Sequence, residues 1–120
     1  MPTVLVAIAG ALGAVVRYRI GLAVGVRTFP WATLGINISG SFLLAMVLAG
    51  PAATRWPTAT STAVAVGFIG AYTTFSTFSY ETFTLVRTER TAEAIGYVAL
   101  SLIGGLVATG LGYVAGRAIA

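Results

Sequence analysis

Long uncharged runs are the feature of this sequence that most restricts its fold. Residues 28–54, 56–80 and 94–116 form runs of 27, 25 and 23 residues without a charged side chain. A helix needs about 20 apolar residues to cross a bilayer, so each run is long enough for one membrane span. A shorter apolar run ends at Arg17, so a first span has to continue through this arginine to about Gly25. The sequence therefore predicts four membrane spans.

The four predicted helices occupy residues 3–25, 31–50, 58–88 and 93–118. The composition agrees, because 58% of the residues are hydrophobic and the mean hydropathy is +0.94. Short turns between the spans leave no residues for a soluble domain, and the chain has no His and no Cys for catalysis. We predict one all-α, multi-pass domain of the plasma membrane, in contact with lipid, that is not an enzyme. A cleaved signal peptide is disfavoured, because the first residues, Met-Pro-Thr, carry no positive side chain.

The basic charge of the chain comes from arginines at loops and helix ends, and the formal net charge is +4. We interpret these arginines as membrane anchors and topology signals, not as a nucleic-acid site. In the loops, Arg27, Arg87 and Arg90 on one side oppose Arg55 and Arg117 on the other. Counting Arg17 and Arg19 with the first loop gives five against two and favours that loop being cytoplasmic, so the positive-inside rule leaves the orientation open. A chain with so weak a bias is able to insert in both orientations.

The segment GAYTTFSTFSYETF, residues 70–83, carries eight hydroxyl side chains in fourteen positions. It lies in the predicted third span, which is longer than a bilayer requires. Gly67 and Gly70 lower helix propensity, and the following hydroxyls can bond backbone carbonyls, so we predict a break within residues 70–74. A broken helix at membrane depth is tolerated only where it is buried in protein or lines a wet cavity. Alternatively, each hydroxyl simply bonds its own helix at a helix contact.

Two aromatic rings accompany these hydroxyls. Phe75 and Phe78 are three residues apart, which puts them on one face of a helix that restarts after the break. Such a pair is typical of a core or a lipid contact. It also permits anion binding, because hydroxyl hydrogens and the positive edges of phenyl rings can both face an anion.

Other polar groups are predicted at membrane depth in the second and fourth spans. Asn37 lies mid-span with Ser41 one turn later, and its amide must find partners or serve as interhelical glue. Tyr97 and Ser101 are four residues apart and share a face. A stripe of small residues on the fourth span predicts close helix packing; its members are Gly104, Ala108, Gly112 and Gly116.

Three segments, GALGAVVRY (10–18), TLGINISGSF (33–42) and GFIGAYTTFSTF (67–78), occur in this order in a four-span chain. Together they resemble the Fluc (CrcB) family of fluoride channels, and the resemblance covers essentially the whole chain. It implies an antiparallel, dual-topology homodimer that encloses two fluoride pathways and a central sodium ion. The implied function is a passive, fluoride-selective channel that exports cytoplasmic fluoride down its electrochemical gradient.

The resemblance also implies roles for particular residues. Asn37, Phe75 and Phe78 are expected to contact fluoride. The backbone carbonyls of Gly70 and Thr73 from both subunits are expected to hold sodium, a hard cation that prefers oxygen ligands. Further residues are expected to extend a polar track for the anion: Ser76, Thr77, Ser79, Tyr97 and Ser101.

Two charged residues complete the expected pathway. Arg17 is expected to face an aqueous vestibule and to raise the local anion concentration, and Glu81 to lie at the outer end of the pathway. The alternative for both is that their side chains extend to the lipid headgroups.

Two other functions fit a four-span chain of this size. A small dual-topology multidrug exporter needs an ionisable residue deep in its cavity, whereas here only Glu81 comes near that position, toward the end of the third span. A structural membrane assembly subunit would transport nothing. Fluoride efflux compared with efflux of a cationic dye separates these alternatives.

Overall fold

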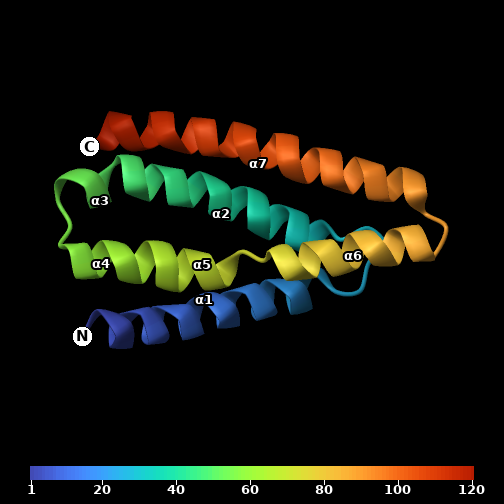
Figure 1. The fold of residues 1–120 in the computed structure, drawn as a ribbon, viewed down its shortest axis with the longest axis horizontal. Helices are drawn as coiled ribbons and strands as arrows, with labels where there is room; N and C mark the ends of the chain where they lie inside the picture. Colours follow the sequence, from blue (N-terminus) through green and yellow to red (C-terminus); the bar gives the residue numbers. More distant parts are fainter.

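The fold is entirely helical, and the computed structural model describes all residues, 1–120. Long helices lie side by side along the longest axis of the molecule (Figure 1). In chain order the elements are α1 (Pro2–Val24), α2 (Trp31–Ala49), α3 (Pro51–Thr54), α4 (Thr58–Thr62), the π-helical segment η1 (Ala63–Ile69), α5 (Gly70–Tyr72), α6 (Phe75–Arg87) and α7 (Thr91–Ile119).

Three stretches are long and apolar enough to cross a membrane: α1, α2 together with α3, and α7. The remaining stretch consists of the continuous run α4–η1–α5 and, end to end with it, α6 (Figure 1). We call these two pieces the first half (Thr58–Tyr72) and the second half (Phe75–Arg87) of the third span. Each of the four predicted ranges overlaps one of these stretches.

The third span is interrupted where the sequence predicts a break. Thr73 and Thr74 have extended backbone, with ψ of 160° at Thr73 and φ and ψ of −153° and 121° at Thr74. The predicted break within residues 70–74 is therefore confirmed. The π-helix directly before it was not predicted, since no residue pattern distinguishes it from an α-helix.

Glycines allow α1 to approach the first half of the third span closely. A methyl group on Gly13 would collide with the backbone of Phe68, and one on Gly67 would lie 2.9 Å from the carbonyl oxygen of Val6. The two helices are thus in backbone-to-backbone contact on both sides. Any larger side chain at these glycines would force them apart.

The same kind of contact joins α2 to α7. A methyl group on Gly112 would collide with the backbone of Phe42, and one on Gly116 would reach the carbonyl oxygen of Met46. The stripe of small residues on the fourth span, predicted as a packing surface, is confirmed in that role.

Few side chains are enclosed within the chain: 16 of its 120 residues are buried. A small core forms where α2, α6 and α7 meet, and it consists of Leu34, Leu85, Ala94 and Tyr97. Large apolar side chains are exposed along α1 and α7, which are the outer helices in Figure 1. An apolar exterior of this kind suits contact with lipid or with a second protein surface.

Candidate functional site at the helix break

The side chain of Asn37 on α2 pairs with the backbone of the break. Its Oδ1 accepts a hydrogen bond from the Thr74 N–H at 2.9 Å, and its Nδ2 donates to the Thr74 carbonyl oxygen at 3.0 Å. In a continuous helix the Thr74 N–H would instead bond the carbonyl of Gly70, four residues earlier. The Asn37 amide thus replaces a helical hydrogen bond and satisfies both backbone groups of Thr74.

Thr74 also caps the second half of the third span. Its Oγ1 accepts a hydrogen bond from the Thr77 N–H at 3.2 Å, and its hydroxyl donates to the Thr77 Oγ1 at 3.1 Å. Threonine is a favoured N-cap because its oxygen satisfies an N–H that has no partner in the first turn. Here the cap fixes where α6 restarts.

These side-chain bonds leave two backbone carbonyls free. The amides that would reach Gly70 and Thr73 in a continuous helix are those of Thr74 and Thr77, and both are bonded elsewhere. The carbonyl oxygens of Gly70 and Thr73 accept no hydrogen bond in the chain. Of the two carbonyls between them, that of Ala71 accepts a hydrogen bond from Arg17 Nε at 3.1 Å. The break therefore presents unpaired carbonyl oxygens at Gly70 and Thr73.

Phe75 and Phe78 lie in the first turn of the second half, and their rings differ in exposure. Their ring centroids are 5.7 Å apart, and the ring of Phe78 lies 5.1 Å from that of Tyr97 on α7. Phe78 packs against the core, whereas the Phe75 side chain is 77% exposed in the single chain. One ring of the pair is anchored and the other is free to meet a partner or a ligand.

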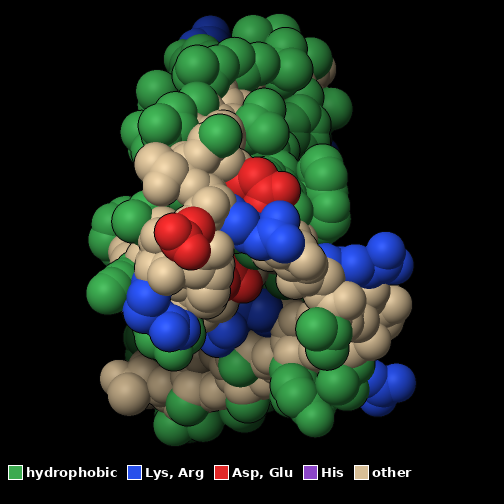
Figure 2. Space-filling model, turned by 90° about the vertical axis from the view of Figure 1, so that its right-hand side faces the viewer, with side chains coloured by type: hydrophobic (Ala, Val, Ile, Leu, Met, Phe, Trp, Pro, Cys, Tyr) green, Lys and Arg blue, Asp and Glu red, His purple; other side chains and the backbone are tan.

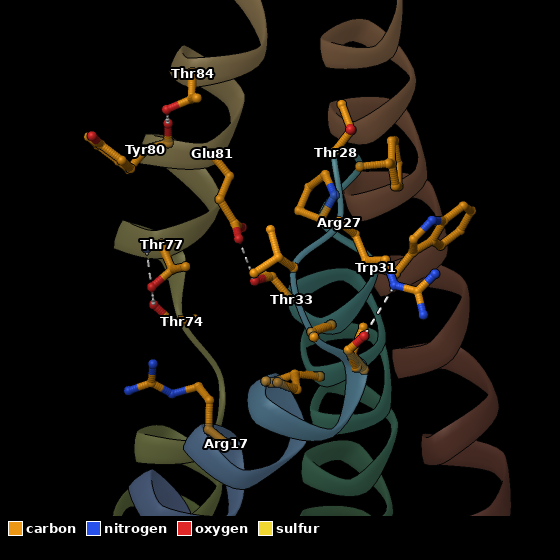
Figure 3. Close-up of a pocket in the computed structure, with 18 of the residues that line it drawn as sticks. Arg17, Arg27, Thr28, Trp31, Thr33, Thr74, Thr77, Tyr80, Glu81 and Thr84 are labelled. Atoms are coloured by element: carbon orange, nitrogen blue, oxygen red, sulfur yellow. Dashed lines mark hydrogen bonds between the residues drawn. The ribbon is translucent and has the colours of Figure 1, made fainter.

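One turn further along α6, the carboxylate of Glu81 accepts two hydrogen bonds. Thr33 Oγ1 on α2 donates to one oxygen at 3.1 Å, and the hydroxyl of Tyr97 donates to the other at 2.9 Å. Figure 3 shows the Glu81 side chain directed at Thr33. Tyr97 has no exposed surface. The three side chains join α2, α6 and α7 through one polar network.

A pocket of about 1010 Å³ opens beside this network, between the end of α1, the 25–30 loop, the start of α2, and α6. Arg17 and Glu81 both line it, and Arg17 lies near Thr74 at the break (Figure 3). They form no ion pair with each other, since Arg90 and Glu93 make the single salt bridge of the chain, at 3.4 Å. Figure 2 shows charged side chains gathered around a hollow at this end.

A family model described as "CrcB-like protein, Camphor Resistance (CrcB)" matches residues 4–113. This chain belongs to the CrcB family. It is 45% identical over 117 residues to "Fluoride-specific ion channel FluC 1" of Bacillus thuringiensis subsp. konkukian, an alignment that covers 94% of this chain and 85% of that protein.

Two other CrcB relatives have similar coverage. "Fluoride-specific ion channel FluC" of Bordetella petrii is 43% identical over 118 residues, or 95% of this chain and 90% of that protein. "Fluoride-specific ion channel FluC 2" of Geobacillus kaustophilus is 48% identical over 119 residues, or 93% of this chain and 90% of that protein.

The structure of this CrcB chain brings together some of the predicted site residues and separates others. Asn37, Gly70, Thr73 and Thr77 gather at the break, and Glu81 meets Tyr97. Ser76 and Ser79 lie exposed on α6. Ser101 lies one turn beyond Tyr97 on α7, and its buried hydroxyl has no hydrogen-bond partner.

Two residues that contribute to the CrcB site were missed in the sequence. Thr33 bonds Glu81, and Thr74 provides both the cap of α6 and the partner of Asn37. Thr33 had a signal, because it lies four residues before Asn37 and therefore shares its helix face. Thr74 had none that set it apart from the other hydroxyls of its segment.

Proposed function

We propose that this chain is a fluoride-specific ion channel through which cytoplasmic fluoride leaves the cell passively. Support comes from the CrcB family and from relatives that carry this name and are 43–48% identical to the chain. The observation that carries the proposal is the break itself. Beside it stand an uncharged amide, a phenylalanine pair and hydroxyls that continue toward a pocket containing an arginine.

The energetics of fluoride require no pump. Hydrogen fluoride crosses a bilayer as a neutral weak acid and dissociates inside, where the anion is trapped. A membrane potential that is negative inside drives an anion outward with about 2.3 kcal/mol per 100 mV. A multi-pass protein of the inner membrane that offers a selective path is sufficient, and the function is not enzymatic.

In this proposal the anion meets donors that carry no net charge. Asn37 uses one N–H on the Thr74 carbonyl and keeps a second N–H for fluoride. The positive ring edges of Phe75 and Phe78 flank the path, and hydroxyls extend it: Ser76, Thr77, Ser79, Tyr97 and Ser101. Neutral donors replace part of the hydration shell without trapping the ion.

Arg17 and Glu81 then act at the pocket. The Arg17 Nε is fixed on the Ala71 carbonyl, and its guanidinium keeps donors that can attract anions from solution. Glu81 is held at the far side by Thr33 and Tyr97, so its charge is compensated by hydrogen bonds and does not pair with Arg17. The pocket therefore keeps a cationic group available to the anion.

The functional unit is an antiparallel, dual-topology homodimer with a central sodium ion. The oxygens of Gly70 and Thr73 fit this ion, because they accept no hydrogen bond and neutral oxygens suit a hard cation. One chain offers two of them, so two chains related by a twofold axis would offer four. When bound, sodium would attract carbonyl oxygens of both subunits and so hold them together. The exposed ring of Phe75 would then be covered by the partner subunit.

Efflux from proteoliposomes tests the function. Purified protein should release fluoride but not chloride, as read by ion-selective electrodes, and should not release a cationic dye. Dye efflux coupled to a proton gradient would instead indicate a multidrug exporter. Absence of any flux from a well-folded preparation would indicate a structural subunit. The topology is tested on the same protein by labelling one engineered loop cysteine from each side of the membrane, and labelling from one side alone would contradict dual topology.

A further inference from the structure

Asn37 is the side chain from another span that bonds both backbone groups of Thr74 at the break in the third span. Without its Oδ1, the Thr74 N–H would have two choices: to remain unpaired, or to bond the Gly70 carbonyl in helical geometry. An unpaired N–H away from water costs about 1–3 kcal/mol, so the helical bond would be favoured. That bond would use the carbonyl of Gly70, which is free in the structure.

The rest of the break depends less on this amide. The Thr73 carbonyl is free because the Thr77 N–H bonds the Thr74 hydroxyl, a contact within α6 and its cap. The Ala71 carbonyl is held from α1 by Arg17. Of the two oxygens assigned to sodium, only that of Gly70 is freed by a side chain from another span.

We infer that Asn37 is a positioning residue with two separable roles, one for each end of its amide. The acceptor, Oδ1, keeps the Gly70 carbonyl free and so maintains the cation site. The donor, Nδ2, holds the Thr74 carbonyl and presents its second N–H to the anion path. The inference rests on the sodium site and fluoride path proposed above, and it couples them through one side chain.

Two substitutions separate these roles because they remove different ends of the amide. Asn37→Asp keeps an oxygen that can accept the Thr74 N–H but removes the donor and adds a negative charge. Asn37→Leu has a similar size and removes both ends. Ser41→Ala is a matched control on the same helix: the Ser41 hydroxyl lines a pocket with Thr73 and Thr74, but its one hydrogen bond goes to the backbone carbonyl of Asn37 and none goes to the break.

The experiment measures three quantities on each purified variant. The first is the shift of the thermal unfolding midpoint when sodium replaces N-methyl-D-glucamine, because a cation that binds only the folded dimer raises that midpoint. The second is fluoride efflux from proteoliposomes. The third is solvent exchange of the Thr74 amide proton in selectively ¹⁵N-labelled protein.

We expect the sodium-dependent shift to persist in Asn37→Asp and in Ser41→Ala, and to disappear in Asn37→Leu. Fluoride efflux should be lost in both Asn37 variants, and the Thr74 amide should be protected from exchange in the wild type and in Asn37→Asp. Loss of the sodium shift in Asn37→Asp, or its retention in Asn37→Leu, would overturn the inference.

Amide exchange also separates this inference from the proposals beneath it. If sodium has no effect on the wild type, the sodium site is wrong, and the Thr74 amide then tests the Asn37 contact alone, because that contact requires the amide to be protected. Rapid exchange at Thr74 in the wild type would show that the Asn37 contact is absent, whatever the fluoride result. If Asn37→Leu does not fold, the wild type and Asn37→Asp still decide between these outcomes.

Discussion

The two halves of the third span are held in place by different means. The first half lies against α1 through glycines, so that backbone touches backbone at Gly13 and Gly67. The second half touches its neighbours through side chains, with Phe78 against Tyr97 and Glu81 bonded to Thr33. The halves belong to one predicted span. The first half is held by backbone contact at glycines, which have no side chain, and the second half is held by contacts between side chains.

This difference gives the two halves different properties: the first half is held rigidly, and the second half carries the accessible hydroxyls and rings. Close backbone contact leaves the first half little freedom, and its last turn carries the carbonyl of Gly70. Contacts through longer side chains leave the second half with surfaces between them, where hydroxyls and rings remain accessible. An ion path needs both features, because donors are useful only when the backbone beneath them is held in place.

The largest effect is expected from filling a backbone contact of the first half. Gly13→Ala places a methyl group against the backbone of Phe68, which cannot rotate away as a side chain can. We expect destabilisation of about 1–3 kcal/mol and loss of the folded protein in detergent. Thermal unfolding and gel filtration measure this.

Gly21→Ala on the same helix is the control for that substitution. A methyl group there meets nothing within 4 Å. It should leave the protein as stable as the wild type, or up to about 1 kcal/mol more stable, because alanine is the better helix former. Equal destabilisation by both substitutions would show that the close contact with Phe68 is not what holds the first half.

A smaller effect is expected from substituting the two rings of the second half, and for Phe75 this effect should be confined to transport. Phe75→Ile and Phe78→Ile keep apolar bulk but lose the polarised ring edge, so each should lower fluoride efflux about tenfold, equivalent to 1.4 kcal/mol. Phe78→Ile should also lower the unfolding midpoint, because its ring packs on Tyr97. Phe75 is largely exposed, so its substitution should leave the single-chain fold intact.

Phe83→Ile is the matched control for the two rings. Phe83 lies on the same helix, is 57% exposed and does not line the pocket. Its substitution should change efflux less than twofold, and surface changes of this kind alter stability by about 0.5 kcal/mol or less. Native-rate efflux from both Phe75→Ile and Phe78→Ile would leave the two rings a packing role only.

The sequence predicted the broken span but not how the break is held. Uncharged runs and helix-weakening residues are local features, so the helical stretches and the break at residues 70–74 could be anticipated. The bond from Asn37 to Thr74 joins residues 37 positions apart. Its existence depends on how α2 lies against the break, which no local pattern encodes. The pairing of Glu81 with Thr33 is hidden for the same reason.

The sequence also did not predict which hydroxyls bond their own helix and which bond at the break. Both kinds of hydroxyl occur in the structure. Within residues 70–83, Thr73 and Thr82 donate to carbonyls four residues earlier, as the packing alternative predicts. Thr74 and Thr77 bond each other and the restarting backbone. Only the position of the break determines which hydroxyl belongs to which group.

The smallest effect is expected at a hydroxyl of the first kind, and it tests this distinction most closely. Thr82→Val keeps the shape of the side chain and removes one bond, which runs from Thr82 Oγ1 to the Phe78 carbonyl oxygen at 2.8 Å. Bonds of this type add little to a helix. We expect stability within about 0.5 kcal/mol of the wild type and fluoride efflux changed less than twofold.

Thr77→Val removes the partner of the Thr74 hydroxyl beside the break and should lower efflux severalfold. Equal losses from the two variants, measured by electrode on matched proteoliposomes, would mean that the hydroxyls of the second half act as one continuous surface and that the break does not select among them.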